Sequence, residues 1–155
     1  MTTTNFINTY MNHIPGFNGA HPCDILPPIK FKNNIASLII NLDQNELPGS
    51  HWVGLFFTRL ANGSNICVFY DPLGHACTNK HILRYISLIT SEVIFNKTAI
   101  QSTQSNYCGL FSMAFIIFYS FNNGKFTLSK LNNMYSKNKL SLNDTIVYKY
   151  IINNI

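Results

Sequence analysis

The stretch SNYCGLFSMAFIIFYSF, residues 105–121, joins a polar, turn-prone run to a long apolar one, and a cysteine stands at the junction. From Cys108 onward the run is apolar nearly all round, which is typical of a helix buried at the centre of a domain. Cys108 would then lie in the first helical turn, where unpaired backbone N–H groups and the helix dipole favour a thiolate. By itself, a cysteine in this position is more often a small buried hydrophobe than a nucleophile. The rest of the chain has to decide between the two interpretations.

Length and composition predict a single domain. A chain of 155 residues that is 46% hydrophobic has the size of one ordinary domain, so we expect one unit over residues 1–155. No segment has the roughly 18 to 20 apolar residues needed to span a bilayer, and the N-terminus lacks the pattern of a signal peptide. The four cysteines lack the spacing of a disulfide framework, which fits a reducing compartment. We therefore expect a protein that is neither secreted nor bound to a membrane.

The charge balance makes an acidic partner such as a nucleic acid plausible. The formal net charge is +5, although only 11% of the residues are charged. The basic side chains considered for such a surface are Lys30, Lys32, Arg59, Lys80, Arg84 and Lys97. They form no single run, so a solvated surface is favoured over a defined nucleic-acid site.

The hydrophobic pattern predicts a series of strands flanked by helices. We expect strands at 35–42, 51–60, 65–71 and 91–96, and helices at about 3–12, 78–89, 108–121, 127–136 and 142–153. Four prolines and two glycines predict an ordered loop over residues 14–28. Thr78 is the expected cap of the second helix, and Ser141 with Asp144 has the spacing of a capping box before the last. The predicted fold class is α+β, with a small, mostly antiparallel sheet packed by helices and Cys108 at the N-terminus of a central buried helix.

A histidine and a carboxylate stand at the ends of two neighbouring strands. His51 opens the strand 51–60, Asp71 closes the strand 65–71, and the turn residues 61–64 make the two a hairpin. A hairpin places these two ends side by side, so Asp71 can orient the imidazole of His51. The other imidazole nitrogen can then meet the sulfur of Cys108. Trp52 would shield the pair from water, and Gly109 allows a substrate backbone to approach closely.

The same residues resemble a known family of proteases. HW at 51–52, YDPLG at 70–74 and IQSTQSNYCGLF at 100–111 resemble, in the same order, the His-Trp, acid-Pro-x-Gly and Gln…Cys-Gly-Leu-Phe blocks of the adenovirus protease (adenain) family. IPGF at 14–17 resembles the Phe-Pro-Gly-Phe of that family. The similarity covers about residues 5–120 and includes the Maverick/Polinton and adintovirus proteases. It extends more loosely to the Ulp-type SUMO and ubiquitin-like proteases, which share the adenain fold.

The resemblance assigns a role to each matched position. It makes Cys108 the nucleophile, His51 the general base and Asp71 the acid that orients the histidine. Gln101, seven residues before the cysteine, matches the glutamine of the oxyanion hole. Gln104 is the rival for this role, because other members of the wider clan place their glutamine nearer the cysteine.

The resemblance also implies a function and a set of partners. The expected activity is that of a cysteine endopeptidase that cleaves viral or transposon structural precursors at glycine-containing sites. The chemistry needs no cofactor, while DNA and a short viral peptide are candidate activators because both stimulate adenain. We expect a monomer located in the virion and in the host nucleus or cytoplasm. One alternative is a deubiquitinase or SUMO-deconjugating protease. Tyr107 argues against it, because Ulp enzymes commonly have an aspartate at this position. Another is a catalytically inactive DNA-binding virion protein on the same fold.

Two pairs of His-x-Cys leave a metal site as a further alternative. His21 with Cys23, and His75 with Cys77, place nitrogen and sulfur ligands at close spacing. Structural zinc sites more often show two cysteines separated by two to four residues. Ordinary loop residues are therefore favoured over a zinc site at both pairs.

Overall fold

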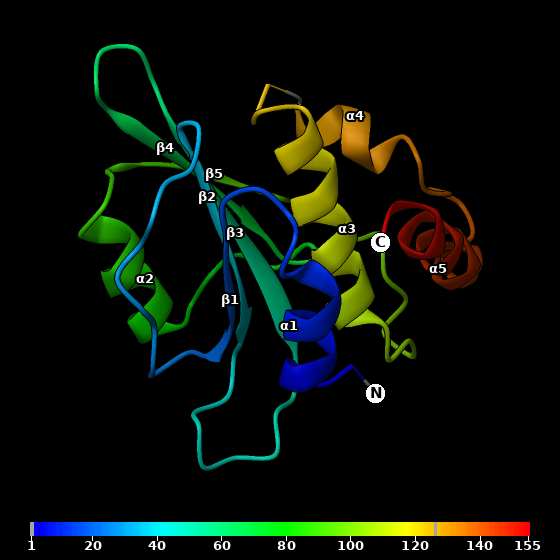
Figure 1. The fold of residues 1–155 in the computed structure, drawn as a ribbon. Helices are drawn as coiled ribbons and strands as arrows, with labels where there is room; N and C mark the ends of the chain where they lie inside the picture. Colours follow the sequence, from blue (N-terminus) through cyan, green and yellow to red (C-terminus); the bar gives the residue numbers. More distant parts are fainter. Residues whose placement is uncertain (1, 126) are drawn as a thin grey trace.

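The computed structural model describes residues 2–125 and 127–155. Its five strands form one sheet in chain order (Figure 1). They are β1 Phe17–Pro22, β2 Ile35–Asn41, β3 Trp52–Arg59, β4 Asn65–Tyr70 and β5 Glu92–Phe95. The central strand β3 is antiparallel to both β2 and β4, whereas the edge strands β1 and β5 run parallel to their neighbours. The predicted α+β class is confirmed, and the sheet is evenly mixed rather than mostly antiparallel.

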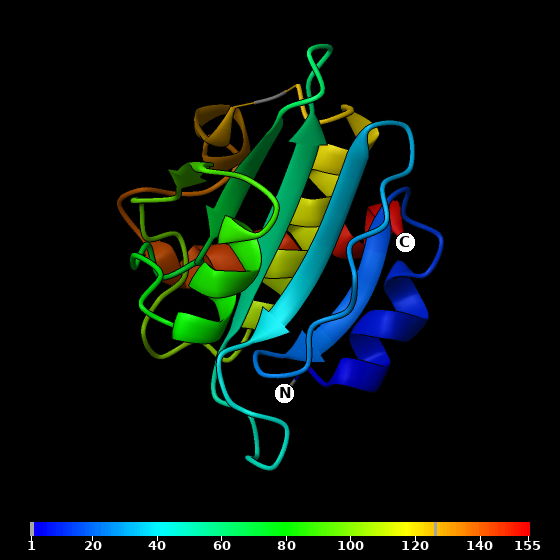
Figure 2. The same ribbon diagram turned by 90° about the vertical axis from the view of Figure 1, so that its left-hand side faces the viewer.

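Helices cover both faces of this sheet. They are α1 Thr4–Met11, α2 Lys80–Ser87, α3 Cys108–Phe121, α4 Leu128–Asn132 and α5 Asn143–Asn154, with a 3-10 turn at Leu140–Leu142. Figures 1 and 2 show α2 on one face and α3 on the other, with α1 and α5 beside α3. None of the described helices combines the length and the apolar character that crossing a membrane would require.

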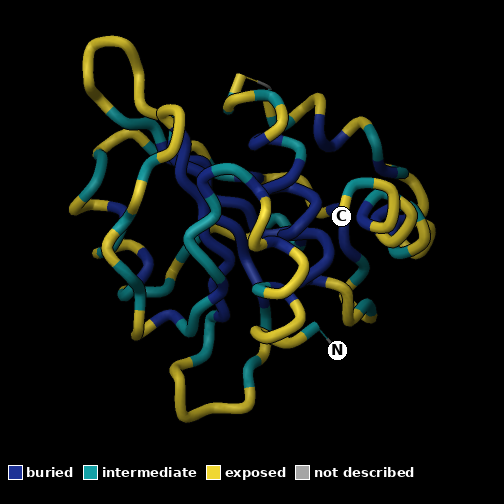
Figure 3. Tube along the Cα trace, in the orientation of Figure 1, coloured by how far each residue is buried: buried dark blue, intermediate teal, exposed yellow. Residues whose placement is uncertain are grey.

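Both faces of the central strands are buried, which explains their continuous apolar sequences. On β2, Ile35 and Ile39 belong to the core beneath α3, whereas Leu38 and Ile40 belong to the core beneath α2. A strand between two helical layers has no solvent face, so the usual alternation of polar and apolar residues is lost. Figure 3 shows the resulting buried centre, formed by the sheet and α3.

Close packing fixes the central helix α3 against strands β3 and β4. A Cβ atom added to Gly54 of β3 would lie 2.6 Å from Cδ1 of Phe115 on α3, so only glycine admits the helix at this distance. On β4, the ring of Tyr70 stacks on Phe115 with centroids 4.5 Å apart and planes 8° from parallel. Since protein interiors are close-packed, these contacts set where the first turn of α3 lies relative to the strand ends.

The predicted loop over residues 14–28 contains strand β1, and this prediction was wrong for Phe17–Pro22. β1 lies at the edge of the sheet, where Pro22 can end the strand without removing a hydrogen bond from its interior. Its register with β2 shifts between Phe17 and Ala20, beside Gly19 with a φ of +100°. An irregular edge strand of this kind has little periodicity for a sequence pattern to detect.

Three helix boundaries also differ from the sequence prediction. The cap of α2 is Asn79 rather than Thr78, because the Asn79 side chain accepts from the N–H groups of His81 and Ile82. The helix expected at 127–136 is the five-residue α4, and position 126 lies outside the described residues. The capping box of Ser141 and Asp144 is absent, since α5 begins at Asn143 with no side-chain cap at Leu142.

Candidate active site

The β3–β4 hairpin brings His51 and Asp71 together as the sequence predicted. His51 directly precedes β3 and Asp71 directly follows β4, and these two strands pair antiparallel. His51 Nε2 lies 2.7 Å from Asp71 Oδ1. The same oxygen accepts from the N–H of Leu73, and the Asp71 carbonyl accepts from Asn96 Nδ2 at 2.9 Å. Asp71 is only 3% exposed, so the fold defines the position and the hydrogen bonds of its carboxylate.

Cys108 is the first residue of α3, and it lies beside His51. Because His51 Nε2 is engaged by Asp71, Nδ1 is the ring nitrogen that remains for the thiol. Burial by itself would raise the pKa of Cys108. Interaction with His51, together with the backbone N–H groups of Trp52 and Gly109, outweighs this effect and lowers the pKa below the ordinary value of 9.0.

The electrostatics of His51 are complementary to those of Cys108. Burial would lower the pKa of His51, but the hydrogen bonds and charges of Asp71 and Cys108 raise it from 6.5 to about 9. A histidine whose pKa is raised, beside a thiol whose pKa is lowered, favours transfer of the thiol proton to the imidazole and so an imidazolium–thiolate pair. Such a pair is chemically suited to nucleophilic attack followed by proton transfer.

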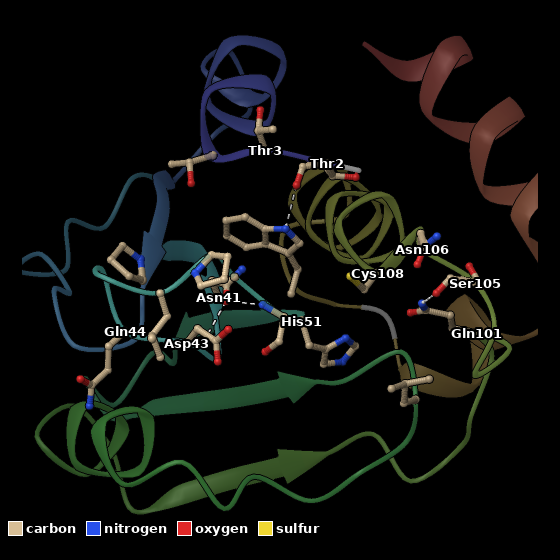
Figure 4. Close-up of a pocket in the computed structure, with 18 of the residues that line it drawn as sticks. Thr2, Thr3, Asn41, Asp43, Gln44, His51, Gln101, Ser105, Asn106 and Cys108 are labelled. Carbon is tan, nitrogen blue, oxygen red and sulfur yellow. Dashed lines mark hydrogen bonds between the residues drawn. The ribbon is translucent and has the colours of Figure 1, made fainter.

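Gln101, and not Gln104, is the glutamine that the fold brings to this site. Gln101 is 3% exposed, and its Nε2 donates to the carbonyl of Ser105 at 2.9 Å. Its Oε1 is buried without a hydrogen-bond partner among the described residues. Gln101 lines the same pocket as His51 and Cys108, whereas Gln104 is exposed and does not line it. Figure 4 labels His51, Gln101 and Cys108 and draws the Gln101–Ser105 hydrogen bond as a dashed line.

The pocket around Cys108 is a cavity of about 460 Å³, and three parts of the chain supply most of its lining. One wall is the N-terminal segment 2–4, the second is the β2–β3 connection and the third is the segment 101–108. The indole of Trp52 is buried and donates to the Thr2 carbonyl at 3.0 Å, which joins the first wall to β3 (Figure 4). Among the described residues, no lysine or arginine lines this pocket.

Two asparagines that sequence reasoning missed hold the backbone next to His51 and Asp71. Asn41, at the end of β2, accepts through Oδ1 from the N–H groups of Asp43 and Ser50 and so closes the connection that leads to His51. Asn96 is buried and binds the backbone of Asp71. The sequence signal that could have identified them is a polar residue directly after an apolar run. Many surface positions of this chain have the same pattern, so the signal is not specific.

The two His-x-Cys pairs make contacts within the chain. Cys23 is buried and donates to the Leu42 carbonyl, while His21 contacts the Asn18 carbonyl. His75 lies 3.8 Å from Asp71 Oδ2, and its side chain is 71% exposed. In the described part of the chain, no group of three or more His, Cys, Asp or Glu side chains is arranged to hold a metal ion.

Comparisons with known proteins bear on the fold and the family of the chain. Among curated proteins none matches the chain. The crystal structure of the ASFV pS273R protease is similar, with a TM-score of 0.53 and 16% identity over 79% of this chain and 44% of that one. The chain therefore spans less than half the length of that protease. A second similar structure is the central domain of the uncharacterized protein Lpg1148 from Legionella pneumophila. The match has a TM-score of 0.51 and 12% identity, and it covers 94% of each chain.

Likeness at these identities shows the fold, whereas the sequence match is more specific. The sequence profile described as adenovirus endoprotease matches residues 6–154, which is nearly the whole chain. The match includes the helices α4 and α5, for which the quoted sequence blocks offered no resemblance. The chain belongs to the adenovirus endoprotease family of peptidases.

Proposed function

We propose that this protein is a cysteine endopeptidase in which Cys108 is the nucleophile. The observation that carries the proposal is the 2.7 Å contact between His51 and Asp71 beside a thiol of lowered pKa at the start of α3. His51 is the general base and acid, and Asp71 orients its ring. Gln101 and the Cys108 N–H are the donors to the oxyanion. The residue types and their placement meet the requirements of an acyl-transfer site.

The proposed reaction has two steps. The Cys108 thiolate attacks the scissile carbonyl carbon, the carbonyl electrons move to oxygen, and the N–H donors stabilise the negative charge. As the tetrahedral species collapses, the C–N bond breaks and the imidazolium of His51 gives its proton to the leaving amine. Neutral His51 then takes a proton from water, whose oxygen attacks the thioester. Collapse releases the carboxylic acid product and restores the thiolate, so neither step requires a cofactor.

The proposed substrates are structural precursor proteins of a virus or transposon, cut at glycine-containing sites. The family supports this proposal, and so does the crowding next to the nucleophile. A Cβ atom on Gly109 would lie 2.5 Å from Cβ of Thr2, so the N-terminal segment runs close to the first turn of α3. Thr2 also lines the pocket that contains Cys108, and small residues in an extended substrate suit a pocket narrowed by this segment.

Regulation and location are proposed on the family resemblance alone. We propose DNA and a short viral peptide as activators, and the virion and the host nucleus or cytoplasm as the places of action. We further propose that the protein works as a monomer.

The decisive experiment is alkylation of the native protein with iodoacetamide across a range of pH, with the modified cysteine located by mass spectrometry. We expect alkylation of Cys108 below about pH 7, together with loss of cleavage of a Gly-Gly peptide in Cys108→Ala. Cys77→Ser is the matched control, because it removes a half-buried thiol of raised pKa and leaves Cys108 in place. An active Cys108→Ala protein would refute the proposal.

Two further measurements separate the alternatives. Labelling by a ubiquitin-like protein with a C-terminal electrophile would identify a deconjugating protease instead. Salt-sensitive DNA binding without a reactive thiol would indicate an inactive DNA-binding protein.

A further inference from the structure

The first turn of α5 is hydrogen-bonded to the segment that carries Gln101. Asn143 is fully buried, and its Nδ2 donates to the carbonyl of Ile100 at 2.7 Å. The same side chain donates to the carbonyl of Ser136 and accepts from its N–H, so both polar atoms of the amide are engaged. Asn143 therefore joins α5 to the residue immediately before Gln101.

Asp144 makes a second connection to the same segment. Its Oδ1 accepts from the hydroxyl of Ser105 at 2.7 Å, although the two residues are 39 positions apart in sequence. Ser105 in turn accepts Gln101 Nε2 on its backbone carbonyl at 2.9 Å, and its hydroxyl accepts from the N–H of Tyr107. Ser105 thus links the carboxylate on α5 both to the Gln101 amide and to the residue that precedes Cys108.

The remaining anchors of this segment hold its backbone and not the Gln101 amide. The N–H groups of Ile100 and Gln101 both donate to the carbonyl of Pro72, next to Asp71. Among the described residues, the Gln101 side chain makes one hydrogen bond, in which its Nε2 donates to the carbonyl of Ser105. Because Gln101 Oε1 has no partner in the described part of the chain, the direction of the amide depends on where the Ser105 carbonyl lies.

We propose that Asp144 and Ser105 are positioning residues that aim the Gln101 amide at the oxyanion, so that α5 is a working part of the active site. This inference rests on the proposed function, because it assumes that Gln101 donates to the oxyanion. A carboxylate in the first turn also favours its own helix through the helix dipole. A test must therefore distinguish aiming of the amide from stabilisation of α5.

The first test compares variants of the Asp144–Ser105 contact in the full chain. Asp144→Ala and Ser105→Ala each remove the contact, whereas Asp144→Asn keeps an oxygen that can accept from the Ser105 hydroxyl. We expect kcat on a Gly-Gly peptide to fall about 10-fold in the two alanine variants with little change in KM, since a small misplacement of a donor weakens transition-state stabilisation. We expect Asp144→Asn to recover most of this loss, and the exposed neighbour Thr145 supplies the control Thr145→Ala.

Two reagents separate the oxyanion donor from the thiolate in the same variants. A Gly-Gly peptide aldehyde adds to the Cys108 thiol as a thiohemiacetal, whose oxygen occupies the position of the oxyanion. Iodoacetamide alkylates the thiolate without forming an oxyanion. We expect affinity for the aldehyde to fall about 10-fold in Asp144→Ala while the rate of alkylation stays unchanged. If Asp144→Ala lowered the affinity for the aldehyde and the rate of alkylation equally, in proportion to a loss of folded protein, Asp144 would have a purely structural role. That result would overturn the inference.

A double-mutant cycle with Gln101→Ala completes the test. If Asp144 acts through Gln101, the loss of kcat in Asp144→Ala should largely disappear in the Gln101→Ala background, because coupled residues are not additive. Additive losses would overturn the inference. Full activity in Gln101→Ala would remove the oxyanion assignment and this inference with it, whereas impaired Gln101→Ala beside fully active Asp144→Ala would overturn the inference alone.

Discussion

The charge of Asp71 should control the reactivity of Cys108 through His51. Asp71→Asn is the appropriate change, because the amide keeps an oxygen that can accept from His51 Nε2 and from the N–H of Leu73. The variant therefore removes the negative charge and preserves the geometry of the hairpin end.

The size of the effect follows from the pKa of His51. Its rise from 6.5 to about 9 corresponds to about 3 kcal/mol in favour of the imidazolium, contributed by Asp71 and Cys108 against the opposing effect of burial. Without the carboxylate, less opposes the effect of burial, so the pKa of His51 should fall. The pKa of the Cys108 thiol should rise, because its neighbour His51 is then less often cationic. If about half or more of the roughly 3 kcal/mol is lost, we expect the rate of Cys108 alkylation at about pH 6 to fall roughly 10- to 100-fold.

The assay is the rate of iodoacetamide alkylation at Cys108 over a range of pH, measured by mass spectrometry on the intact folded protein. Cys77, whose pKa is raised mainly by burial, is the internal reference for a thiol without an activating histidine. Glu92→Gln on β5 makes the same carboxylate-to-amide change at an exposed position and should leave the profile unchanged. An Asp71→Asn protein with the wild-type profile would refute the reasoning.

Three other predictions test separate parts of the structure. Gln101→Ala should lower kcat about 10²- to 10³-fold while Gln104→Ala leaves peptide cleavage near the wild-type rate, and the reverse ranking would contradict the assignment. Gly54→Ala should lower the free energy of unfolding by about 1 to 3 kcal/mol, measured by urea denaturation, because the new methyl group meets the ring of Phe115; an unchanged midpoint would show that the helix shifts freely. In Cys108→Ala, we expect the remaining contact with Asp71 to keep the pKa of His51 raised; this contribution to stability should be fully present below about pH 6.5 and be lost as the pH rises through the folded-state value. Unfolding free energies of Cys108→Ala should therefore fall relative to those of His51→Gln/Cys108→Ala over this range, and parallel curves would exclude the effect.

Local patterns were sufficient for much of the site. The sequence of α3 is apolar on nearly all sides, which indicated a central helix. The hairpin pattern placed His51 and Asp71 at adjacent strand ends. Both inferences depend on neighbours within a few residues or on one tight turn, where periodicity is informative. They remain the strongest part of the sequence prediction because their physical causes are local.

Edge pairing and polar contacts over long sequence distances were not accessible in the same way. β1 pairs in parallel with β2, and no local alternation marks this short edge strand. Ser141 and Asp144 had the spacing of a capping box, yet Asp144 binds Ser105 instead. In that case a tertiary hydrogen bond satisfied the carboxylate, and the local motif did not form.

The sequence by itself determined the α+β class, the central helix and the order of His51, Asp71 and Cys108, because each is encoded in periodicity or in local motifs. Only the tertiary structure decided that Gln101 rather than Gln104 enters the pocket, since the two lie three positions apart in one irregular segment. The path of that segment is set by the Pro72 carbonyl and by the first turn of α5, which come from distant parts of the chain. A buried polar group requires a partner, and only the folded chain determines which distant residue supplies it.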